Sequence, residues 1–389
     1  MSLKNIKALT YNNKNIYIII SGYLIFIFTL LSIYDFNFSL FVQLAENTNL
    51  SKLPSNFLKS SGAGYDGQYY FRLSHNPLNI NPEYIGINLD NPSYRYSRIG
   101  YPLIIWFFTL GSLQLIVPAS IIINLISIFL VFLIAFKIFE IFNLEKNNLF
   151  IIILLPGYLF CISRNLPELI EVLLILSTLF FYLKNKNTFF IFSSILLILV
   201  RETSIIFCLS LLIYNYIENK KLSKSFYLIT PIIFYFLWQI TIFIMFRDIS
   251  VNSGFKLHFE MPLLGAYKML NQTIFFEENI LKKITFLIEY LYIYLTIILA
   301  IFFIYNYKIN NLFKIAFILY AIYFLCLNPV VLSSDWAFMR VFLELNVFSF
   351  FIIFSQKNNL TNYYKFFSLF IWIFIFVRII TDEYIKYYI

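Results

Sequence analysis

The chain has 389 residues, of which 60% are hydrophobic, 21% aromatic and only 13% charged. Soluble domains carry about 25% charged residues, and a soluble fold cannot hide this much apolar surface, so the composition argues for a membrane protein. The net charge of +9 fits lysines that hold cytoplasmic loops against anionic lipid. We therefore expect membrane lipid, and no nucleic acid, as a partner.

The N-terminal segment is polar and contains lysines, and the apolar run at 16–34 is long enough to cross a bilayer. This order predicts a cytoplasmic N-terminus. Residues 35–98 contain no span and form the largest polar segment, so we expect a first outer loop with short helices. The three cysteines show no disulfide or metal spacing, and the two histidines are too few for a zinc site.

The remaining apolar runs predict an all-α polytopic fold of about 11 transmembrane helices in a single domain, residues 1–389. Residues 99–110 are too short to cross alone and are expected as a re-entrant or surface helix. A second outer loop is expected at 247–283. The expected spans after the first are 118–139, 150–162, 166–183, 188–200, 203–216, 226–246, 284–305, 312–332, 341–354 and 366–380.

One polar segment of the first outer loop stands out: Gly64-Tyr65-Asp66-Gly67-Gln68-Tyr69-Tyr70-Phe71-Arg72. A carboxylate such as Asp66 can take the proton of an attacking hydroxyl, and glycines on both sides would let the backbone approach a substrate. The polar side chains after it are candidate substrate contacts: Gln68, Tyr69, Tyr70 and Arg72. The alternative is a turn in which Asp66 only caps a helix over 68–74.

Arginines near the outer ends of spans form a second group of candidates. Arg95 and Arg98 precede an apolar segment and suit a lipid-linked phosphate, although interfacial anchoring is the plain alternative. Arg201 and Glu202 interrupt two apolar runs with almost no loop between them. Charge at membrane depth is costly and tends to be paired and functional.

The last outer turn, 333–340, brings an acid and a base close together in sequence. Asp335 and Arg340 are candidate substrate contacts there, and Glu344 is one helical turn beyond Arg340, where it can hold the arginine in place. By the same local reasoning, Arg164 is expected to pair with Glu168 or Glu171. A salt-bridged loop without function is the alternative.

These motifs resemble the GT-C-fold integral-membrane glycosyltransferases, which use polyprenyl-phosphate-linked sugars. The resemblance rests on Asp66-Gly67-Gln68-Tyr69-Tyr70, on the Tyr/Arg stretch before Tyr101-Pro102, and on Arg201-Glu202-Thr203. It is similar to a bacterial branch with an Asp-Gly-Gln-aromatic-Tyr motif and, more remotely, to the glycolipid-anchor mannosyltransferases.

The resemblance implies a glycosyltransferase of the bacterial inner membrane with an extracytoplasmic site. Asp66 would be the base, and Arg340 or Arg201 would contact the donor phosphate. The acceptor would be a lipid-linked glycan or another cell-surface acceptor. Many members have two adjacent acids where the first span ends, and this chain has only Asp35. The choice between Asp66 and Asp35, and the use of a divalent metal, therefore stay open.

Two other classes of function are compatible with the sequence. A transporter or flippase of lipid-linked glycans would place facing charges near the bilayer midplane and often shows internal repeats, and no repeat is found here. A non-catalytic membrane assembly protein would have no reason to gather Asp66, Arg201 and Arg340. The enzyme hypothesis therefore predicts that these three residues meet around one cavity.

Overall fold

The computed structural model describes residues 14–219, 226–248, 258–356 and 358–388, and 75% of the structure is helical. The expected helical fold is therefore confirmed. Strand pairing within the described residues is limited to a two-residue hairpin, in which Glu83 lies opposite Asn88 and Tyr84 opposite Ile87, and to isolated bridges.

The elements of the first half are α2 (Lys14–Ile33), η1 (Phe38–Phe41), η2 (Leu50–Lys52), α3 (Gly67–His75), β1 (Glu83–Tyr84), β2 (Ile87–Asn88), α4 (Pro92–Ser97), α5 (Gly100–Thr109), α6 (Ile116–Phe142), η3 (Lys146–Leu154), α7 (Gly157–Ser163), α8 (Glu168–Leu183) and α9 (Asn187–Val200). The expected short helices of the first loop are present. The expected helix at 150–162 is instead a 3₁₀ helix followed by α7, because Pro156 cannot continue a regular hydrogen-bond ladder.

The elements of the second half are η4 (Glu202–Ser204), α10 (Ile205–Asn219), η6 (Phe226–Leu228), α11 (Thr230–Phe246), α13 (Leu264–Asn271), η7 (Gln272–Phe276), α14 (Ile280–Asn306), α15 (Asn311–Leu325), α16 (Pro329–Leu332), α17 (Asp335–Val341), α18 (Leu343–Ile353) and α19 (Asn359–Tyr388). The second outer loop thus contains a helix of its own, α13. Part of this loop, 249–257, lies outside the described residues.

Within the described residues, five helices are long and apolar enough to cross a membrane, which supports the expectation of a membrane protein. They are Ile16–Ile33, Ile116–Phe142, Phe226–Phe246, Ile280–Asn306 and Asn359–Lys386. Further apolar helices of 10–17 residues, α5 among them, are too short for this criterion. The larger number of spans, about 11 by apolar runs of bilayer length, stays a prediction.

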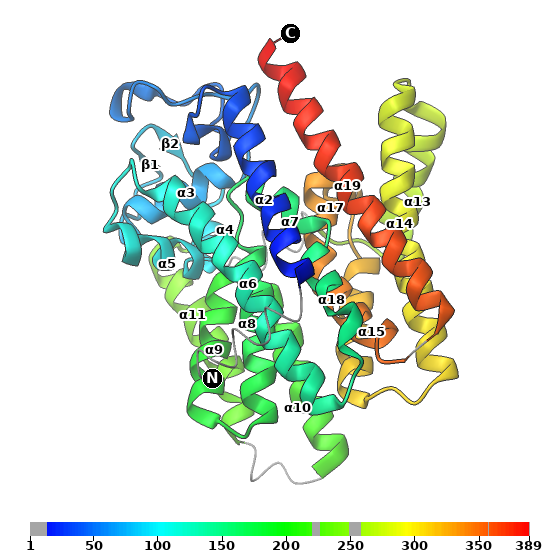
Figure 1. Ribbon diagram of the computed structural model, residues 1–389. Coiled ribbons are helices and arrows are strands. Elements are labelled where there is room, and N and C mark those ends of the chain that lie inside the picture. Colours follow the sequence, from blue (N-terminus) through cyan, green and yellow to red (C-terminus); the bar gives the residue numbers. More distant parts are fainter. Residues whose placement is uncertain (1–13, 220–225, 249–257, 357, 389) are drawn as a thin grey trace.

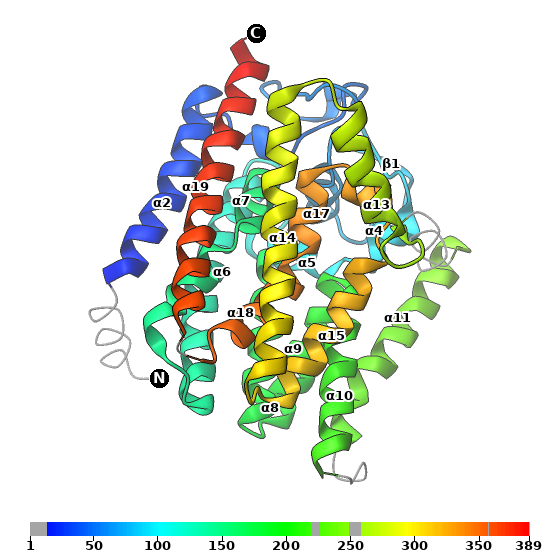
Figure 2. The ribbon, with the colours of Figure 1, turned by 90° about the vertical axis from the view of Figure 1, so that its right-hand side faces the viewer.

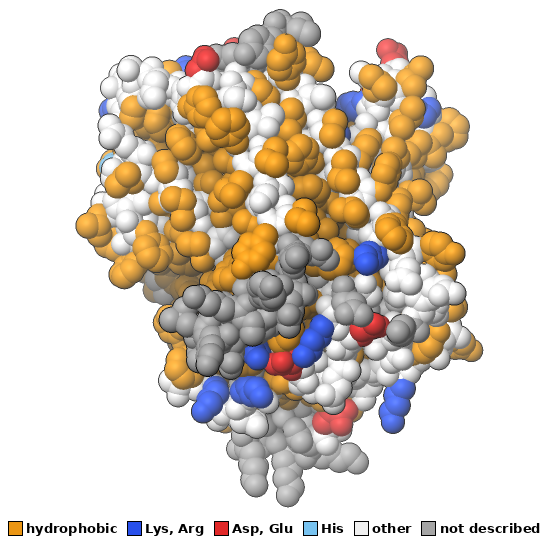
Figure 3. Space-filling view, in the orientation of Figure 1, with side chains coloured by type: hydrophobic (Ala, Val, Ile, Leu, Met, Phe, Trp, Pro, Cys, Tyr) orange, Lys and Arg blue, Asp and Glu red, His pale blue; other side chains and the backbone are white. Residues whose placement is uncertain are grey.

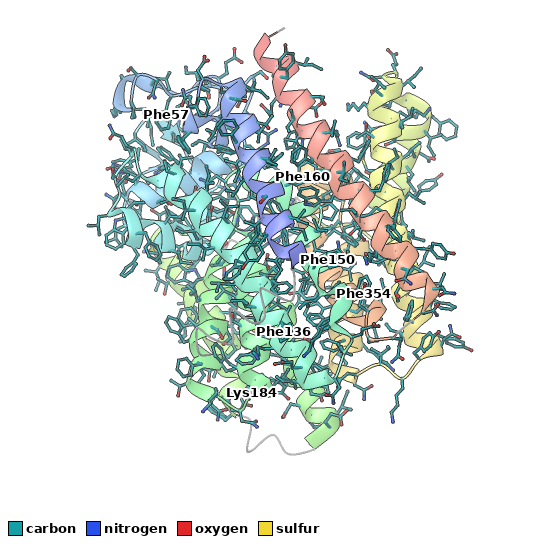
Figure 4. The ribbon with its side chains drawn as sticks, in the orientation of Figure 1. Phe57, Phe136, Phe150, Phe160, Lys184 and Phe354 are labelled. Atoms are coloured by element: carbon teal, nitrogen blue, oxygen red, sulfur yellow. The ribbon has the colours of Figure 1, made fainter. Side chains whose placement is uncertain are left out.

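The helices lie roughly side by side, and residues 35–98 gather at one end of the molecule, the loop end, at the top of Figure 1. The C-terminal part of α19 reaches the same end, next to α2, in both ribbon views (Figures 1 and 2). Phe57 of the first loop and Lys184, which follows α8, lie near opposite ends in Figure 4. The visible surface between the ends is mostly hydrophobic (Figure 3), as expected of a face in contact with lipid.

Two features of the interior position the site. The hydroxyl of Tyr23 in α2 donates to the carbonyl oxygen of Ile153 at 2.8 Å and accepts from Nε1 of Trp372 in α19 at 3.1 Å. These bonds tie the first and last helices to the middle of the chain. The break between α9 and α10 places Arg201 inside the protein, where it is 2% exposed. A buried guanidinium requires carboxylate partners, and the fold supplies them.

Candidate active site

Asp66 occupies the position just before α3, but its side chain makes no capping hydrogen bond with that helix. The carboxylate instead binds two arginines from distant parts of the chain. Its Oδ1 lies 2.9 Å from Nη1 of Arg95, and its Oδ2 lies 2.7 Å from Nη2 of Arg340. The alternative in which Asp66 only caps a helix is therefore not what the structure shows.

The surroundings of Asp66 stabilise the ionised form of its carboxylate. Burial alone would raise the pKa of Asp66, but the nearby charges of Arg95 and Arg340 outweigh burial and hold that pKa well below its usual range. Arg95 is itself fixed by Asp90, 2.7 Å from its Nη2, and by the ring of Tyr69, whose centroid lies 4.1 Å from its guanidinium carbon. The carboxylate is thus held ionised in one place.

Arg340 has donors that no group in the described part of the chain satisfies. Its Nη1 and Nε are buried and have no hydrogen-bond partner among the described residues, and Nε approaches Oε1 of Glu168 only to 3.6 Å. An unsatisfied buried donor costs about 1–3 kcal/mol. Such donors beside a cavity are expected where a ligand with acceptor oxygens binds.

The other candidate arginines also form buried ion pairs. Arg98 binds Glu202 in a bidentate manner, at 2.8 Å from Nε and 2.7 Å from Nη2. Nη1 of Arg201 lies 2.9 Å from Glu171 and 3.0 Å from Glu344, and both glutamates are fully buried. The sequence identified these arginines as candidates, but it did not predict which glutamates they bind.

Two expected partnerships are wrong. Glu344 binds Arg201 rather than Arg340, although it is one helical turn from Arg340 in sequence. Arg164 binds Glu383 of α19, with 3.0 Å between Nη2 and Oε1, and not through the expected local pairing. Both errors come from assuming that charges close in sequence pair with each other, whereas here helix packing decides.

A cavity of about 310 Å³ lies against these arginines. Its walls include apolar side chains from α10, α15, α16 and α17, and its charged lining consists of Arg98, Arg201, Glu202 and Arg340. We call it the arginine cavity. Asp66 is connected to the cavity through Arg340, by the 2.7 Å contact already described. An elongated apolar molecule with an anionic group would match both parts of this lining.

His258 also lines the arginine cavity, and it was not singled out from the sequence. Its Nδ1 is buried without a hydrogen-bond partner among the described residues. Burial, followed by the charge of Arg98, lowers the pKa of His258, so the ring is neutral near pH 7 and can accept a hydrogen bond. No residue spacing around His258 predicts that it lines the cavity. Its position depends on a distant turn, where the backbone N–H of Asn328 donates to the carbonyl oxygen of His258 at 2.9 Å.

The other residues of the Asp66 segment support the loop. Gln68 accepts from the Ala45 amide at 3.0 Å and donates to the Ala63 carbonyl at 2.9 Å. A Cβ on Gly67 would lie 2.3 Å from the carbonyl oxygen of Arg164, and one on Gly64 would lie 2.5 Å from another backbone oxygen. The glycines therefore allow close approach of the protein's own backbone, and not of a substrate as expected.

Three further candidates are placed as follows. Tyr70 is buried and packs edge-on against Tyr101, with 5.5 Å between the ring centroids. Arg72 is buried and donates to the carbonyl oxygens of Asn81 and Pro82, so it braces the first loop. Asp335 begins α17, but its side chain lies outside the described residues.

The alternative base Asp35 is exposed just after α2. Neither Asp35 nor Asp66 lines the arginine cavity, but Asp66 binds Arg340, which does. No group of three or more His, Cys, Asp or Glu side chains in the described part of the chain is arranged to hold a metal ion.

Comparison of the chain with models of known protein families finds no match, and comparisons with curated proteins and with solved structures find none either.

Proposed function

We propose that the protein is a membrane glycosyltransferase that moves a sugar from a polyprenyl-phosphate-linked donor to a hydroxyl of a lipid-linked or other cell-surface glycan. The observation that carries this proposal is the arginine cavity: apolar walls and three guanidinium groups line it, and one of these, Arg340, binds the partly buried carboxylate of Asp66. The proposed setting is a bacterial plasma membrane with the site on its extracytoplasmic side and the N-terminus in the cytoplasm.

The two parts of the cavity lining match the two parts of such a donor. The isoprenoid chain would lie against apolar residues such as Ile205, Ile206 and Val330. The phosphate would accept hydrogen bonds from the unsatisfied Nη1 and Nε of Arg340, with Arg98 and Arg201 beside it. Guanidinium groups suit this role because they present planar, paired donors to phosphate oxygens.

In the transfer step, the acceptor hydroxyl oxygen forms a bond to the anomeric carbon, and the bond between that carbon and the phosphate oxygen breaks. The electron pair of the broken bond stays on the lipid phosphate, where guanidinium groups stabilise it. The hydroxyl proton moves to the Asp66 carboxylate and then to water. The products are the extended glycan and the free lipid phosphate.

A carboxylate with a strongly lowered pKa is a weak base, and the ion pairs of Asp66 lower its pKa in this way. A donor phosphate that binds Arg340 would compete with Asp66 for that guanidinium. Loss of this contact raises the pKa of Asp66, which makes it a better base only when the donor is present. The ion pair between Asp66 and Arg340 thus links donor binding to acceptor activation.

The test is deletion of the chromosomal gene, followed by analysis of cell-surface glycans and complementation with variants. Deletion should remove one sugar from a surface glycan, and Asp66→Asn should fail to restore it. Asp90→Asn is the matched control, since Asp90 also binds Arg95 but its side chain is 48% exposed. Restoration by Asp66→Asn, at membrane levels equal to the wild type, would remove Asp66 as the base.

Transport of a lipid-linked glycan is the second candidate, because Arg201, Glu171 and Glu344 form a charge cluster inside the helical bundle, as transport pathways also do. The two functions differ in their products. A transferase releases free lipid phosphate when purified protein meets donor and acceptor in liposomes, whereas a transporter moves intact lipid-linked glycan between leaflets. Release of lipid phosphate that requires Asp66 would identify the transferase.

A further inference from the structure

A second cavity, of about 510 Å³, lies on another side of the Asp66 segment. It is bounded by the end of α2, by loop residues around 58–65, and by side chains of α17 and α19. Its lining residues include Lys59, Ser60, Ser61, Arg164, Trp336 and Lys386. We call it the polar cavity. Its volume falls within the range of about 300–1,000 Å³ that is typical of small-molecule sites.

The polar cavity combines an aromatic ring with cations and hydroxyl groups. The guanidinium carbon of Arg164 lies 3.5 Å from the ring centroid of Trp336, and Nζ of Lys386 lies 5.2 Å from the same ring. Three cations, Lys59, Arg164 and Lys386, and one carboxylate, Glu383, line the cavity. Side chains that donate and accept hydrogen bonds around a ring suit a hydroxyl-rich ligand that is neutral or acidic.

Tyr65 supplies an independent observation that favours a polar ligand at this wall. It lines the polar cavity, and its buried hydroxyl has no hydrogen-bond partner among the described residues. Its ring also faces Arg340, whose guanidinium carbon lies 5.3 Å from the ring centroid. A sugar hydroxyl in the cavity would give the tyrosine a partner and remove the cost of the unmade bond.

The proposed base, Asp66, lines neither cavity but is linked to a residue of each. Tyr65 lines the polar cavity, Arg340 lines the arginine cavity, and Asp66 follows Tyr65 in sequence and binds Arg340. A donor sugar in one cavity and an acceptor hydroxyl in the other would therefore approach the Asp66 carboxylate from different sides. Movement of Arg340 toward a donor phosphate would free the Oδ2 atom of Asp66 for the acceptor hydroxyl.

We infer that the polar cavity binds the hydroxyl-rich end of the acceptor glycan, a neutral or acidic oligosaccharide, and presents its hydroxyl to Asp66. This inference rests on the proposed function, and its test measures binding without transfer. The probe is the oligosaccharide released by mild acid from surface glycans of the deletion strain, which lack the transferred sugar and so carry the acceptor end.

Ser61→Trp is the decisive variant, because Ser61 is exposed and lines the polar cavity, so a large side chain there fills the cavity without disturbing the core. Ser51→Trp is the matched control, in the same loop and exposed, but outside the lining. Calorimetric titration of purified protein should show binding by the wild type and by Ser51→Trp, and at least 10-fold weaker binding by Ser61→Trp.

A second pair of variants tests the aromatic ring. Trp336→Phe keeps an apolar ring and should weaken binding several-fold, whereas Trp106→Phe on the exposed face of α5 should leave it unchanged. Equal binding by Ser61→Trp and Ser51→Trp, or no binding by the wild type, would overturn the inference. If the wild type binds the oligosaccharide but releases no lipid phosphate from polyprenyl-phosphate sugars extracted from the same cells, the proposed transfer fails while the binding site stands.

Discussion

Replacing Arg340 by Gln tests the link between the arginine cavity and Asp66. The substitution removes the 2.7 Å contact with Asp66 and the 3.6 Å contact with Glu168, a side chain that is 0% exposed. Removing one partner of a buried ion pair costs about 3–5 kcal/mol. We expect a loss near the lower limit, because Arg95 still binds Asp66 and Arg201 lies 3.8 Å from Glu168.

The loss of activity in Arg340→Gln should be larger than its loss of stability explains. Removal of one group that stabilises charge in a transition state reduces the rate by about 10²–10³-fold. The pH dependence of the transfer rate should also change, in a direction that follows from the pKa of Asp66. In the wild type the pKa of Asp66 lies well below its usual range, so the carboxylate stays ionised above about pH 4 and its stabilising contribution is lost only below that. In Arg340→Gln the pKa rises, so the acid limb of the pH–rate profile moves to higher pH.

The assay measures lipid phosphate release between about pH 4 and 8, together with the thermal midpoint of the purified protein. Arg378→Gln is the control, since it removes a buried pair of the same kind, with 2.5 Å between Arg378 and Glu289, that joins α19 to α14. The control should lower the midpoint but keep the wild-type rate per folded molecule. The reasoning is refuted if Arg340→Gln behaves like this control, or if its acid limb does not move.

Two further substitutions test the interior of the site. Arg201→Met should destabilise the protein by about 3–5 kcal/mol, since it leaves buried carboxylates without their cation; adding Glu171→Gln and Glu344→Gln should recover most of the thermal midpoint, and no recovery would contradict the ion-pair explanation. Gly67→Ala should cost about 1–3 kcal/mol by overpacking, because its Cβ would lie 2.3 Å from the Arg164 carbonyl oxygen; an unchanged midpoint would show that the loop adapts.

The helical membrane fold could be predicted from the sequence because apolar runs of bilayer length report directly on the solvent that surrounds them. The enzyme hypothesis predicted that Asp66, Arg201 and Arg340 meet around one cavity; the two arginines line the arginine cavity, and Asp66 is in contact with Arg340 without lining it. The identity of the partners could not be predicted. Arg201 binds Glu344 from a helix far along the chain, and local spacing carries no information about which helices pack together.

The roles of short polar motifs were also only partly predictable. Glycine signals that backbone comes close to something, but the sequence does not say whether that is a substrate or, as at Gly67, another part of the chain. Gln68 has the side chain of a sugar-binding residue and instead braces the loop through Ala45 and Ala63. His258 gave no signal, because its place in the cavity depends on a contact with the distant residue Asn328.

The buried cluster around Arg201 has a consequence for how the protein is made. Helices enter the bilayer in the order of their synthesis, so Glu168 and Glu171 arrive long before α17 and α18 deliver Arg340 and Glu344. Until then the nascent bundle holds an incomplete set of charges, which is costly in a medium of low dielectric. A chain that stops after α15 should therefore be less stable than one that includes α17 and α18, because its buried carboxylates lack Arg340.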